Sequence, residues 1–365
     1  MPKSIYIHIP FCKNICSYCD FCKIYFSPET ANLYIKALKK EITDRYNNEK
    51  IETVYIGGGT PSCLSLDNLK QLFDTIKVFD LSELKEFTFE FNVSDIDENK
   101  LIFLKQNKVN RISIGIETIN KEGQKLLDRE VSKEIISSNI NLAKKYFDNI
   151  NLDIIYAYKN ETIDILKDDL DFITGFNPTH ISCYSLIIEE HTILNNMKVK
   201  PIDEEIDSEM YYYIRDYLLN KGYNHIEISN YSKDGYSPVH NLVYWNNEEY
   251  YGFGAGASGY IGNCRYSNTR NIYGYIEGNY KYTDEILEKK DIVENEMILG
   301  LRKIKGVNKK SFYDKYNKSI DEFFDIGILL KNHLLEENEE YIYIPSDKLY
   351  VSNSILINFI GGINE

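Results

Sequence analysis

The sequence lacks the features of a membrane-spanning, secreted or nucleic-acid-binding protein. No stretch of about 18 consecutive apolar residues occurs, so no transmembrane segment is predicted. Met1-Pro2-Lys3 leads into a strand-like run without the apolar core of a signal peptide. There is no long block of Lys and Arg, and 42 basic against 56 acidic residues give a formal charge of −14. This negative charge disfavours a nucleic-acid partner.

Cysteine is present but is not distributed as in a disulfide-rich domain. Seven cysteines occur in 365 residues, and three of them lie close together near the start of the chain. A metal-type group of cysteines in a chain of this length indicates a reducing compartment, so we expect a cytoplasmic protein. The length suits one large α/β domain and a smaller second domain.

The cysteine triplet is the most informative motif. Cys12, Cys16 and Cys19 are spaced C-x3-C-x2-C directly after the apolar run Ser4–Pro10. Three thiolates on one loop can hold three irons of a [4Fe–4S] cluster and leave the fourth iron open to a small ligand. Cys22 is either a spare thiol or a fourth ligand. A zinc site and three incidental cysteines are the alternative interpretations of the triplet.

The pattern of apolar residues predicts an α/β fold. Strand-like runs cover 4–9, 52–56, 86–92, 111–116, 150–156 and 179–186. Helical patterns cover 34–46, 66–78, 97–107, 133–146, 163–174 and 203–221. Six successive strand–helix units predict a parallel (β/α)6 sheet curled into an incomplete barrel. A complete eight-unit barrel needs two more units, which the sequence does not show.

The character of the chain changes after the barrel units. We expect a barrel domain over 1–225, a connecting region over 226–285 that is rich in Tyr, Asn and Gly, and a C-terminal cap over 286–365. The cap is interpreted as a small α+β domain of winged-helix type with a hairpin around Tyr341–Val351. A DNA-binding role for it is disfavoured by the acidic run at 336–340.

Unusual residues fall where the predicted strands end. Gly57, Gly58, Gly59 and Thr60 follow the second strand. The candidate polar groups on the later strands and loops are Glu90, Glu117, Arg129 and Asp153. The C-terminal ends of the strands carry the site in parallel barrels. Glycine lets the backbone approach a ligand, carboxylates accept from ammonium or ribose hydroxyls, and an Arg donates to a carboxylate. Each single carboxylate has an alternative as a helix cap or a solvated residue.

These motifs together resemble the radical S-adenosylmethionine (SAM) superfamily, including an aromatic Tyr18 before the third cysteine. Within it the chain is similar to the coproporphyrinogen-dehydrogenase-like branch through Tyr6–Cys12, Gly57–Ser62, Arg111–Gly115 and His180–Leu186. The resemblance implies a [4Fe–4S] cluster on Cys12, Cys16 and Cys19 that splits the sulfonium of SAM to a 5′-deoxyadenosyl radical. It implies SAM binding by Tyr6, Tyr18, Gly58, Gly59, Thr60, Glu90, Glu117, Arg129 and Asp153.

Two groups of that branch differ in their motifs. Oxygen-independent coproporphyrinogen dehydrogenases usually have a long segment before their cysteines and a C-x3-C-x2-C-x-C pattern. Here 11 residues precede Cys12, and Cys22 follows Cys19 at a C-x2-C spacing. Haem chaperones of the HemW type match both features. They also carry an H-N-x-x-Y-W motif, which is present as His240–Trp245.

The H-N-x-x-Y-W motif predicts a haem site at His240, Tyr244 and Trp245. A histidine is a natural axial ligand of haem iron, and Trp245 offers a flat face for a porphyrin. The alternative is a buried aromatic cluster around a hydrogen-bonded histidine. The other five histidines are interpreted as structural: His8, His180, His191, His225 and His333.

We therefore expect a haem chaperone that passes haem to acceptor haemoproteins, a membrane-bound acceptor among them. The alternatives are a coproporphyrinogen III dehydrogenase, a divergent radical SAM enzyme on another substrate, and a non-catalytic iron–sulfur module. Four departures from the family pattern leave the substrate and activity open. They are Glu117 for Gln, Val131 for His, 157–162 for a G-L-P-G-Q-T-like loop, and Ser258 for His.

Overall fold

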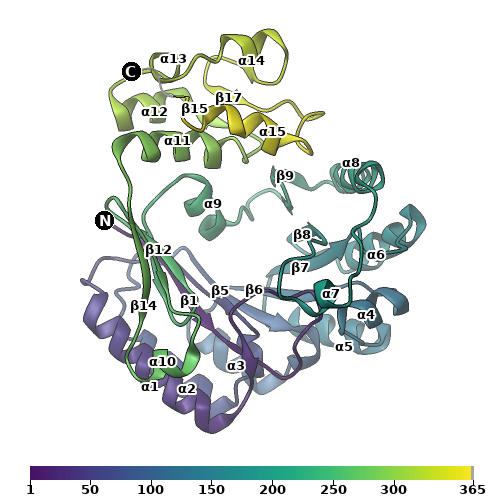
Figure 1. Cartoon of the computed structure of the whole chain (residues 1–365). Helices are drawn as coiled ribbons and strands as arrows, with labels where there is room; N and C mark the ends of the chain where they lie inside the picture. Colours follow the sequence, from purple (N-terminus) through teal and green to yellow (C-terminus); the bar gives the residue numbers. More distant parts are fainter. Residues whose placement is uncertain (363–365) are drawn as a thin grey trace.

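The computed structural model describes residues 1–362, and a curled nine-stranded sheet is its central feature (Figure 1). The strand order is β11-β1-β4-β5-β6-β7-β8-β10-β9. The six expected strands are all present and run parallel to one another: β1 (Ser4–Ile9), β4 (Thr53–Gly58), β5 (Glu86–Asn92), β6 (Arg111–Glu117), β7 (Asn149–Tyr156) and β8 (His180–Ser185). The predicted incomplete parallel barrel is confirmed.

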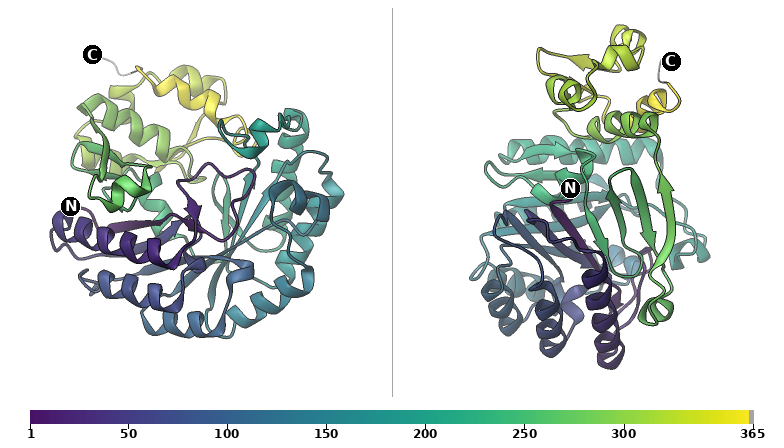
Figure 2. Two further views of the ribbon diagram at one scale, coloured as in Figure 1. Left: turned by 60° about the horizontal axis from the view of Figure 1, so that its bottom comes forward. Right: turned by 90° about the vertical axis from the view of Figure 1, so that its left-hand side faces the viewer.

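Helices cover the outer face of the curled sheet (Figure 2). The six expected helices are α1 (Pro28–Arg45), α2 (Leu66–Ile76), α3 (Glu98–Gln106), α5 (Lys133–Ala143), α6 (Ile163–Gly175) and α8 (Glu204–Asn220). Each begins after a Ser, Thr or Asp whose side chain accepts a hydrogen bond from a backbone N–H of the first turn. The short α4 (Lys121–Leu127) and α7 (Ile193–Asn196) were not predicted, because so few residues show no clear helical period.

Residues 226–285 contribute to both edges of the sheet. At the β8 edge, β10 (Asn230–Ser232) and β9 (Asn224–Glu227) add two antiparallel strands. At the other edge, β11 (Tyr251–Phe253) pairs in parallel with β1. Between them α9 (Val239–Trp245) contacts the first residues of β4 and β5, so it covers the end of the barrel where the strands begin. The sequence did not predict β11, which has only three residues.

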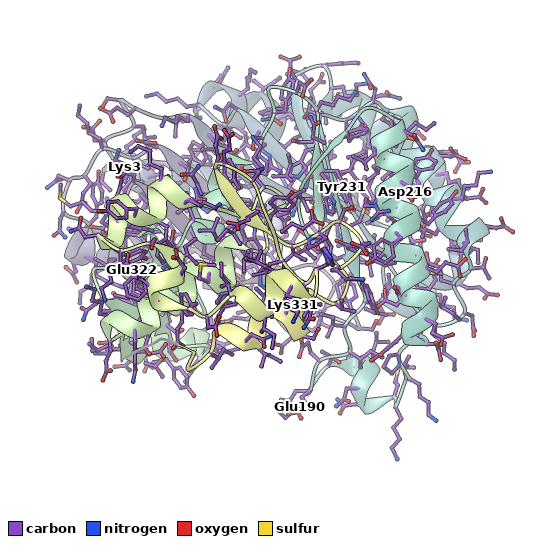
Figure 3. All side chains as sticks on the ribbon, turned by 90° about the horizontal axis from the view of Figure 1, so that it is seen from above. Lys3, Glu190, Asp216, Tyr231, Glu322 and Lys331 are labelled. Carbon is purple, nitrogen blue, oxygen red and sulfur yellow. The ribbon has the colours of Figure 1, made fainter. Side chains whose placement is uncertain are left out.

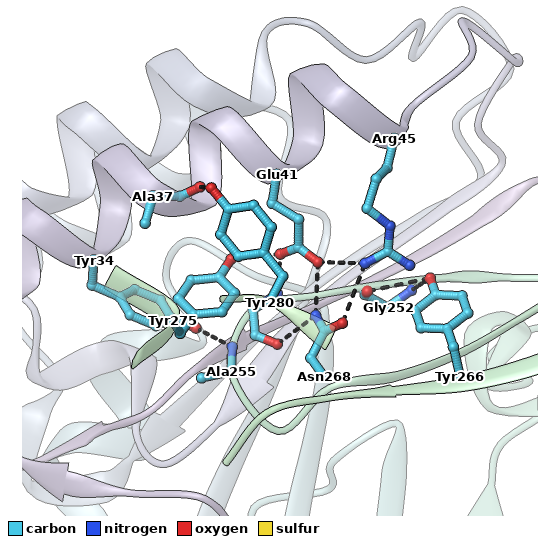
Figure 4. Close-up of polar contacts among 11 residues, drawn as sticks. Tyr34, Ala37, Glu41, Arg45, Gly252, Ala255, Tyr266, Asn268, Tyr275 and Tyr280 are labelled. Carbon is cyan, nitrogen blue, oxygen red and sulfur yellow. Dashed lines mark hydrogen bonds and ion pairs between the residues drawn. The ribbon is translucent and has the colours of Figure 1, made fainter. Parts of the chain in front are cut away.

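A second small sheet stands beside α1. It consists of β12 (Ser258–Ile261), β13 (Cys264–Asn268) and β14 (Lys281–Ile286), with α10 (Ile272–Ile276) in the connection. Figure 4 shows the buried carboxylate of Glu41 on α1 joining these segments. It accepts hydrogen bonds from Asn268 at 2.7 Å, Tyr275 at 2.5 Å and the Gly254 amide at 2.9 Å, and it pairs with Arg45. The Glu41 cluster fixes the position of this sheet against the barrel.

The C-terminal domain is α+β, as expected. It contains the helices α11 (Lys289–Gly300), α12 (Lys309–Tyr316), α13 (Ile320–Phe323), α14 (Gly327–Lys331) and α15 (Ser352–Leu356). Its three-stranded sheet has the order β15 (Val307–Asn308), β17 (Tyr341–Tyr343) and β16 (Glu336–Glu337). The predicted hairpin position, 341–351, was wrong. The turn lies earlier because the Asn338 side chain accepts from the amides of Glu340 and Tyr341. No helix within residues 1–362 is long and apolar enough to cross a membrane.

Candidate functional site

The cysteine triplet lies at the mouth of a cavity inside the barrel. The loop is held at its base by parallel pairing of β2 (Phe11–Cys12) with β3 (Ile24–Tyr25). Cys12, Cys16 and Cys19 all line the cavity, whose volume is about 360 Å³. Cys22 does not line it; its buried thiol contacts the Arg270 carbonyl oxygen at 3.3 Å. The three cysteines that the sequence analysis assigned to the cluster are therefore the ones that face the cavity.

The geometry of the thiols fits a cluster better than a zinc ion. Zinc draws its four ligands to one point, with sulfur at ~2.3 Å. Within residues 1–362, no three His, Cys, Asp or Glu side chains converge on such a point. A [4Fe–4S] cluster binds each thiolate on a separate iron, so its ligands surround a volume. Burial raises the pKa of Cys12, and that of Cys16 to about 11, so ligation must release their protons.

The glycine run packs the end of β4 tightly against its surroundings. A Cβ at Gly59 would lie 2.9 Å from Cys12 Sγ, and one at Gly58 would lie 2.8 Å from the His8 ring. Gly58 also has a φ of +124°, which favours glycine. Thr60 Oγ1 lies 3.5 Å from Cys12 Sγ. Gly58, Gly59 and Thr60, which the sequence analysis assigns to SAM, line the cavity, and the close contacts require glycine at 58 and 59.

Glu90 and Asp153 project into the cavity from neighbouring parts of the sheet. Glu90 accepts hydrogen bonds from the Tyr55 hydroxyl at 2.6 Å and from the Gly58 amide at 3.2 Å. Burial raises the pKa of Glu90 to about 7. Asp153 accepts from Ser113 at 2.8 Å and from Asn151 at 2.6 Å, and burial raises its pKa as well. Both carboxyls are held in place and exposed to the cavity.

Glu117 and Arg129 form a buried ion pair beside the cysteines. Their closest oxygen and nitrogen lie 2.7 Å apart, and both residues line the cavity. Glu117 has a φ of +67°, at the point where the strand ends and its pairing with β7 shifts register. The pair is available to a ligand that carries both an ammonium and a carboxylate.

The two predicted aromatic residues occupy different positions. Tyr18 lines the cavity next to the cysteines. Tyr6 lies behind the cavity wall; its hydroxyl is 2.9 Å from His8 Nδ1, and its ring centroid is 6.1 Å from that of Tyr55. His8 Nε2 in turn bonds the Cys22 carbonyl oxygen at 2.8 Å, so this chain of contacts links β1 to the cysteine loop.

The sequence analysis missed several residues of the cavity wall. The lining also includes Tyr55, Arg111, Ser113, Asn151, Ser182, Tyr184 and Asn241. Most lie two residues from another lining residue on the same strand, as Arg111, Ser113 and Gly115 do on β6. Polar residues that alternate with apolar ones inside an otherwise buried strand mark the inner face of a barrel. This alternation in the sequence could have identified the missed cavity-lining residues on the strands.

His240, Tyr244 and Trp245 lie at the opposite end of the barrel from the cysteines. His240 is fully buried, with Nδ1 2.8 Å from Thr53 Oγ1 and Nε2 2.7 Å from the Tyr244 hydroxyl. Its ring stacks on Tyr55 at 5.2 Å, and burial lowers its pKa to about 3. Trp245 lies near Arg302 of the C-terminal domain, 6.0 Å from its guanidinium. This arrangement corresponds to the buried aromatic cluster, and both ring nitrogens of His240 have partners.

Comparison with known proteins places this geometry in a family. Residues 6–173 match the model of the Radical SAM superfamily, and residues 287–346 match the HemN C-terminal domain. The chain is 37% identical over 370 residues to "Heme chaperone HemW" of Lactococcus lactis, covering 98% of this chain and 97% of that protein. The chain belongs to the HemW family of radical SAM proteins. This membership implies a [4Fe–4S] cluster and SAM as cofactors.

Further relatives support the same family over the full length. "Heme chaperone HemW" of Bacillus subtilis is 35% identical over 378 residues, covering 98% of this chain and 99% of that protein. The structure of coproporphyrinogen III oxidase (HemN) from Escherichia coli covers 98% of this chain with a TM-score of 0.85. At 22% identity, that similarity shows a common fold for the HemW-family chain and the oxidase.

One departure from the HemW-family pattern, the loop 157–162 after β7, has a structural explanation. Ala157 and Asn160 stand where the family loop has Gly, and both keep a left-handed backbone, with φ of 61° and 68°. Glu161 stands where the loop has Gln; burial raises its pKa to about 9, so the acid is neutral at pH 7. Its Oε2 accepts from the Ala157 amide at 2.5 Å. Ser258 contacts Ser267 at an exposed position of the second sheet.

Proposed function

We propose that this protein is a haem chaperone, which binds haem and delivers it to acceptor haemoproteins, some of them at the membrane. The observation that carries this proposal is the full-length similarity to two curated haem chaperones. It includes the barrel, the segment around α9 and the C-terminal domain. The seven unpaired thiols suit a reducing cytoplasm as the place of action.

The residues at the barrel mouth would hold the two cofactors. Cys12, Cys16 and Cys19 would ligate the [4Fe–4S] cluster. When reduced, such a cluster would supply the electron for cleavage of the SAM sulfonium. Glu90 and the Glu117–Arg129 pair offer acceptors for an ammonium and a donor for a carboxylate.

The size of the barrel cavity argues that haem binds elsewhere. The volume of about 360 Å³ is near the lower end of the ~300–1,000 Å³ range of small-molecule sites. The residues assigned to SAM already line this cavity. A cavity of this size occupied by SAM leaves no space for a porphyrin. Haem and SAM therefore occupy separate sites in this proposal.

Anaerobic reconstitution with two ligands tests the function. The cluster-loaded protein is incubated with SAM and haem in one reaction, and with SAM and coproporphyrinogen III in another. We expect stable haem binding with an unchanged porphyrin, and no loss of carbon dioxide from coproporphyrinogen III. Mass spectrometry of the extracted tetrapyrroles and absorbance of the protein give the two readouts.

The same reactions distinguish the alternative functions. Decarboxylated product from coproporphyrinogen III would show a dehydrogenase and would overturn the chaperone proposal. Absence of haem binding together with intact cluster and SAM binding would indicate a radical enzyme on another substrate. A protein that holds the cluster but binds neither SAM nor haem would be a non-catalytic iron–sulfur module.

A further inference from the structure

A large groove lies between the barrel and the C-terminal domain, on the far side of α9 from the barrel cavity. Its volume is about 1370 Å³. The barrel side is formed by β9, the C-terminal end of α8 and residues 232–237, and the other side by α11, α12 and residues 303–308. Leu242 and Asn246 of α9 also line it. Figure 3 shows the C-terminal domain over this end of the barrel, beside Tyr231 and Asp216.

Only one histidine of the chain faces this groove. Of the six histidines, His8, His180 and His240 are buried, and His191 and His333 are exposed without lining the groove. His225 on β9 is half-buried and lines the groove. Its hydrogen bond from Nε2 to the Ile228 carbonyl oxygen is 3.4 Å long, so this contact holds the ring only weakly.

The surroundings of His225 suit a metal ligand. Its ring stacks on Tyr231 with centroids 4.3 Å apart and an interplanar angle of 9°. This contact orients the imidazole without using either nitrogen. Burial lowers the pKa of His225 to about 4, so the ring is neutral at pH 7 and has a lone pair to donate.

The groove lining carries five basic and five acidic residues, and its lysines are the groups that can receive an anionic ligand. Three of its five acidic residues pair with a cation: Asp216 with Arg215, Glu296 with Lys315, and Asp314 with Lys310. Asp234 and Glu248 contact only the amides of Asn224 and Asn246. Among the basic residues, Lys233, Lys303 and Lys305 line the groove without a carboxylate ion-pair partner among residues 1–362. The ammonium of Lys303 reaches only the Asn246 side-chain oxygen, at 2.6 Å.

We propose that this interdomain groove is the haem site, with His225 as the axial ligand of the iron and Lys303, together with Lys233 or Lys305, as partners of the two propionates. This assignment rests on the proposed chaperone function. The groove is large enough for a porphyrin, has apolar walls at Leu242 and Ile304, and brings a weakly hydrogen-bonded imidazole together with ammonium groups that lack an ion-pair partner. Haem in this position would contact α9 from the side opposite SAM.

Haem titration of four proteins tests the assignment. Wild type, His225→Ala, Lys303→Met and the exposed control His333→Ala are titrated anaerobically with ferric haem, followed by the Soret band. In His225→Ala we expect a shifted Soret band and loss of the spectrum of histidine-ligated haem, both restored by added imidazole. In Lys303→Met we expect affinity to fall on the order of tenfold, as for one lost charge pair. His333→Ala should match wild type.

A second ligand, without carboxylates, separates the contribution of the propionates from that of the iron and the porphyrin ring. Haem dimethyl ester has no carboxylates, so Lys303→Met should bind it as well as wild type does. If Lys303→Met loses affinity equally for haem and for haem dimethyl ester, Lys303 does not bind a propionate. Cluster iron content and thermal unfolding report whether each variant is folded.

The outcomes also separate this inference from the proposed function. A His225→Ala protein with wild-type spectrum and affinity would overturn the groove as the haem site and leave the function standing. A wild-type protein that binds no haem would overturn the function itself. His240→Ala is titrated in the same way; loss of haem affinity in this variant while His225→Ala matches wild type would return the site to the aromatic cluster at α9.

Discussion

At the residue scale, the cysteines separate into a group that faces the cavity and a thiol that does not. Cys22 lies at the end of the same loop, but its thiol contacts the Arg270 carbonyl oxygen and a Cβ at Gly256 would meet it. The spacing alone left its role open. The structure supports three ligands, because only Cys12, Cys16 and Cys19 line the cavity.

This difference gives a first prediction. Ala in place of Cys12, Cys16 or Cys19 should remove the iron absorbance of the anaerobically reconstituted protein, because each variant loses one ligand of the cluster. Cys22→Ala should retain most of it, as should the control Cys264→Ala on β13. Iron and sulfide analysis checks the result. Equal iron loss in Cys22→Ala would contradict the three-ligand assignment.

Glu90 gives a second prediction, about pH. Burial raises its pKa to about 7, so the carboxylate that would accept from the SAM ammonium is partly protonated at neutral pH. SAM affinity should fall as pH drops from about 8 to about 6, because protonation removes the negative charge. Calorimetric titration of cluster-loaded protein measures this. Glu90→Gln should bind SAM more weakly at high pH, and its affinity should depend less on pH. If the variant shows the wild-type dependence of SAM affinity on pH, Glu90 does not bind the SAM ammonium.

At the element scale, the loop after β7 preserves its shape with different residues. Ala157 and Asn160 keep the left-handed backbone that glycine adopts easily, and Asn tolerates it better than Ala. Glu161 is buried, and its Oε1 has no hydrogen-bond partner in the structure. A neutral carboxylic acid at this position resembles an amide in size and hydrogen bonding.

The third prediction concerns this acid. The pKa of Glu161 is about 9 in the folded protein against 4.5 for an unperturbed Glu, so the folded state binds its proton more tightly. Its contribution to stability is complete below pH ~4.5 and is lost as pH rises through ~9. Glu161→Gln should therefore gain stability relative to wild type as pH rises. Thermal unfolding across this range tests it, with exposed Glu190→Gln as control; a constant difference would contradict it.

Sequence patterns predicted the elements of the barrel well but not α9. The six parallel strands are long apolar runs with helices between them, and each helix has a capping residue at its start. In α9 the H-N-x-x-Y-W motif is compatible both with a haem ligand and with a buried aromatic cluster. The choice depends on Thr53 and Tyr55, which are far away in sequence and meet His240 only after folding.

At the scale of the whole molecule, contacts distant in sequence hold the parts together. The Glu41 cluster joins α1 to β13, α10 and the turn after β11. On the other side, the Arg215 and Tyr212 side chains of α8 donate to the carbonyls of Ser346 and Asp347 in the C-terminal domain. The cavity and the interdomain groove result from these contacts, so the sequence pattern gave no sign of the groove.

A fourth prediction follows from the Glu41 cluster. Glu41→Ala should lower the free energy of unfolding by about 3 kcal/mol, because it leaves Arg45 and several buried donors without their acceptor. Asp44→Ala, at an exposed position of the same helix, should change it by less than about 0.5 kcal/mol. Urea denaturation measures both. Equal effects would show that the cluster does not fasten the second sheet to the barrel.

The central claim is that the protein passes haem to an acceptor by direct transfer. The most direct measurement loads the cluster- and SAM-bound protein with haem and mixes it with increasing concentrations of an apo-haemoprotein acceptor. Spontaneous loss of haem is measured separately with a haem scavenger. We predict a transfer rate that rises with acceptor concentration and exceeds the rate of spontaneous loss, with the cluster intact. A transfer rate equal to spontaneous loss at every acceptor concentration would contradict the account.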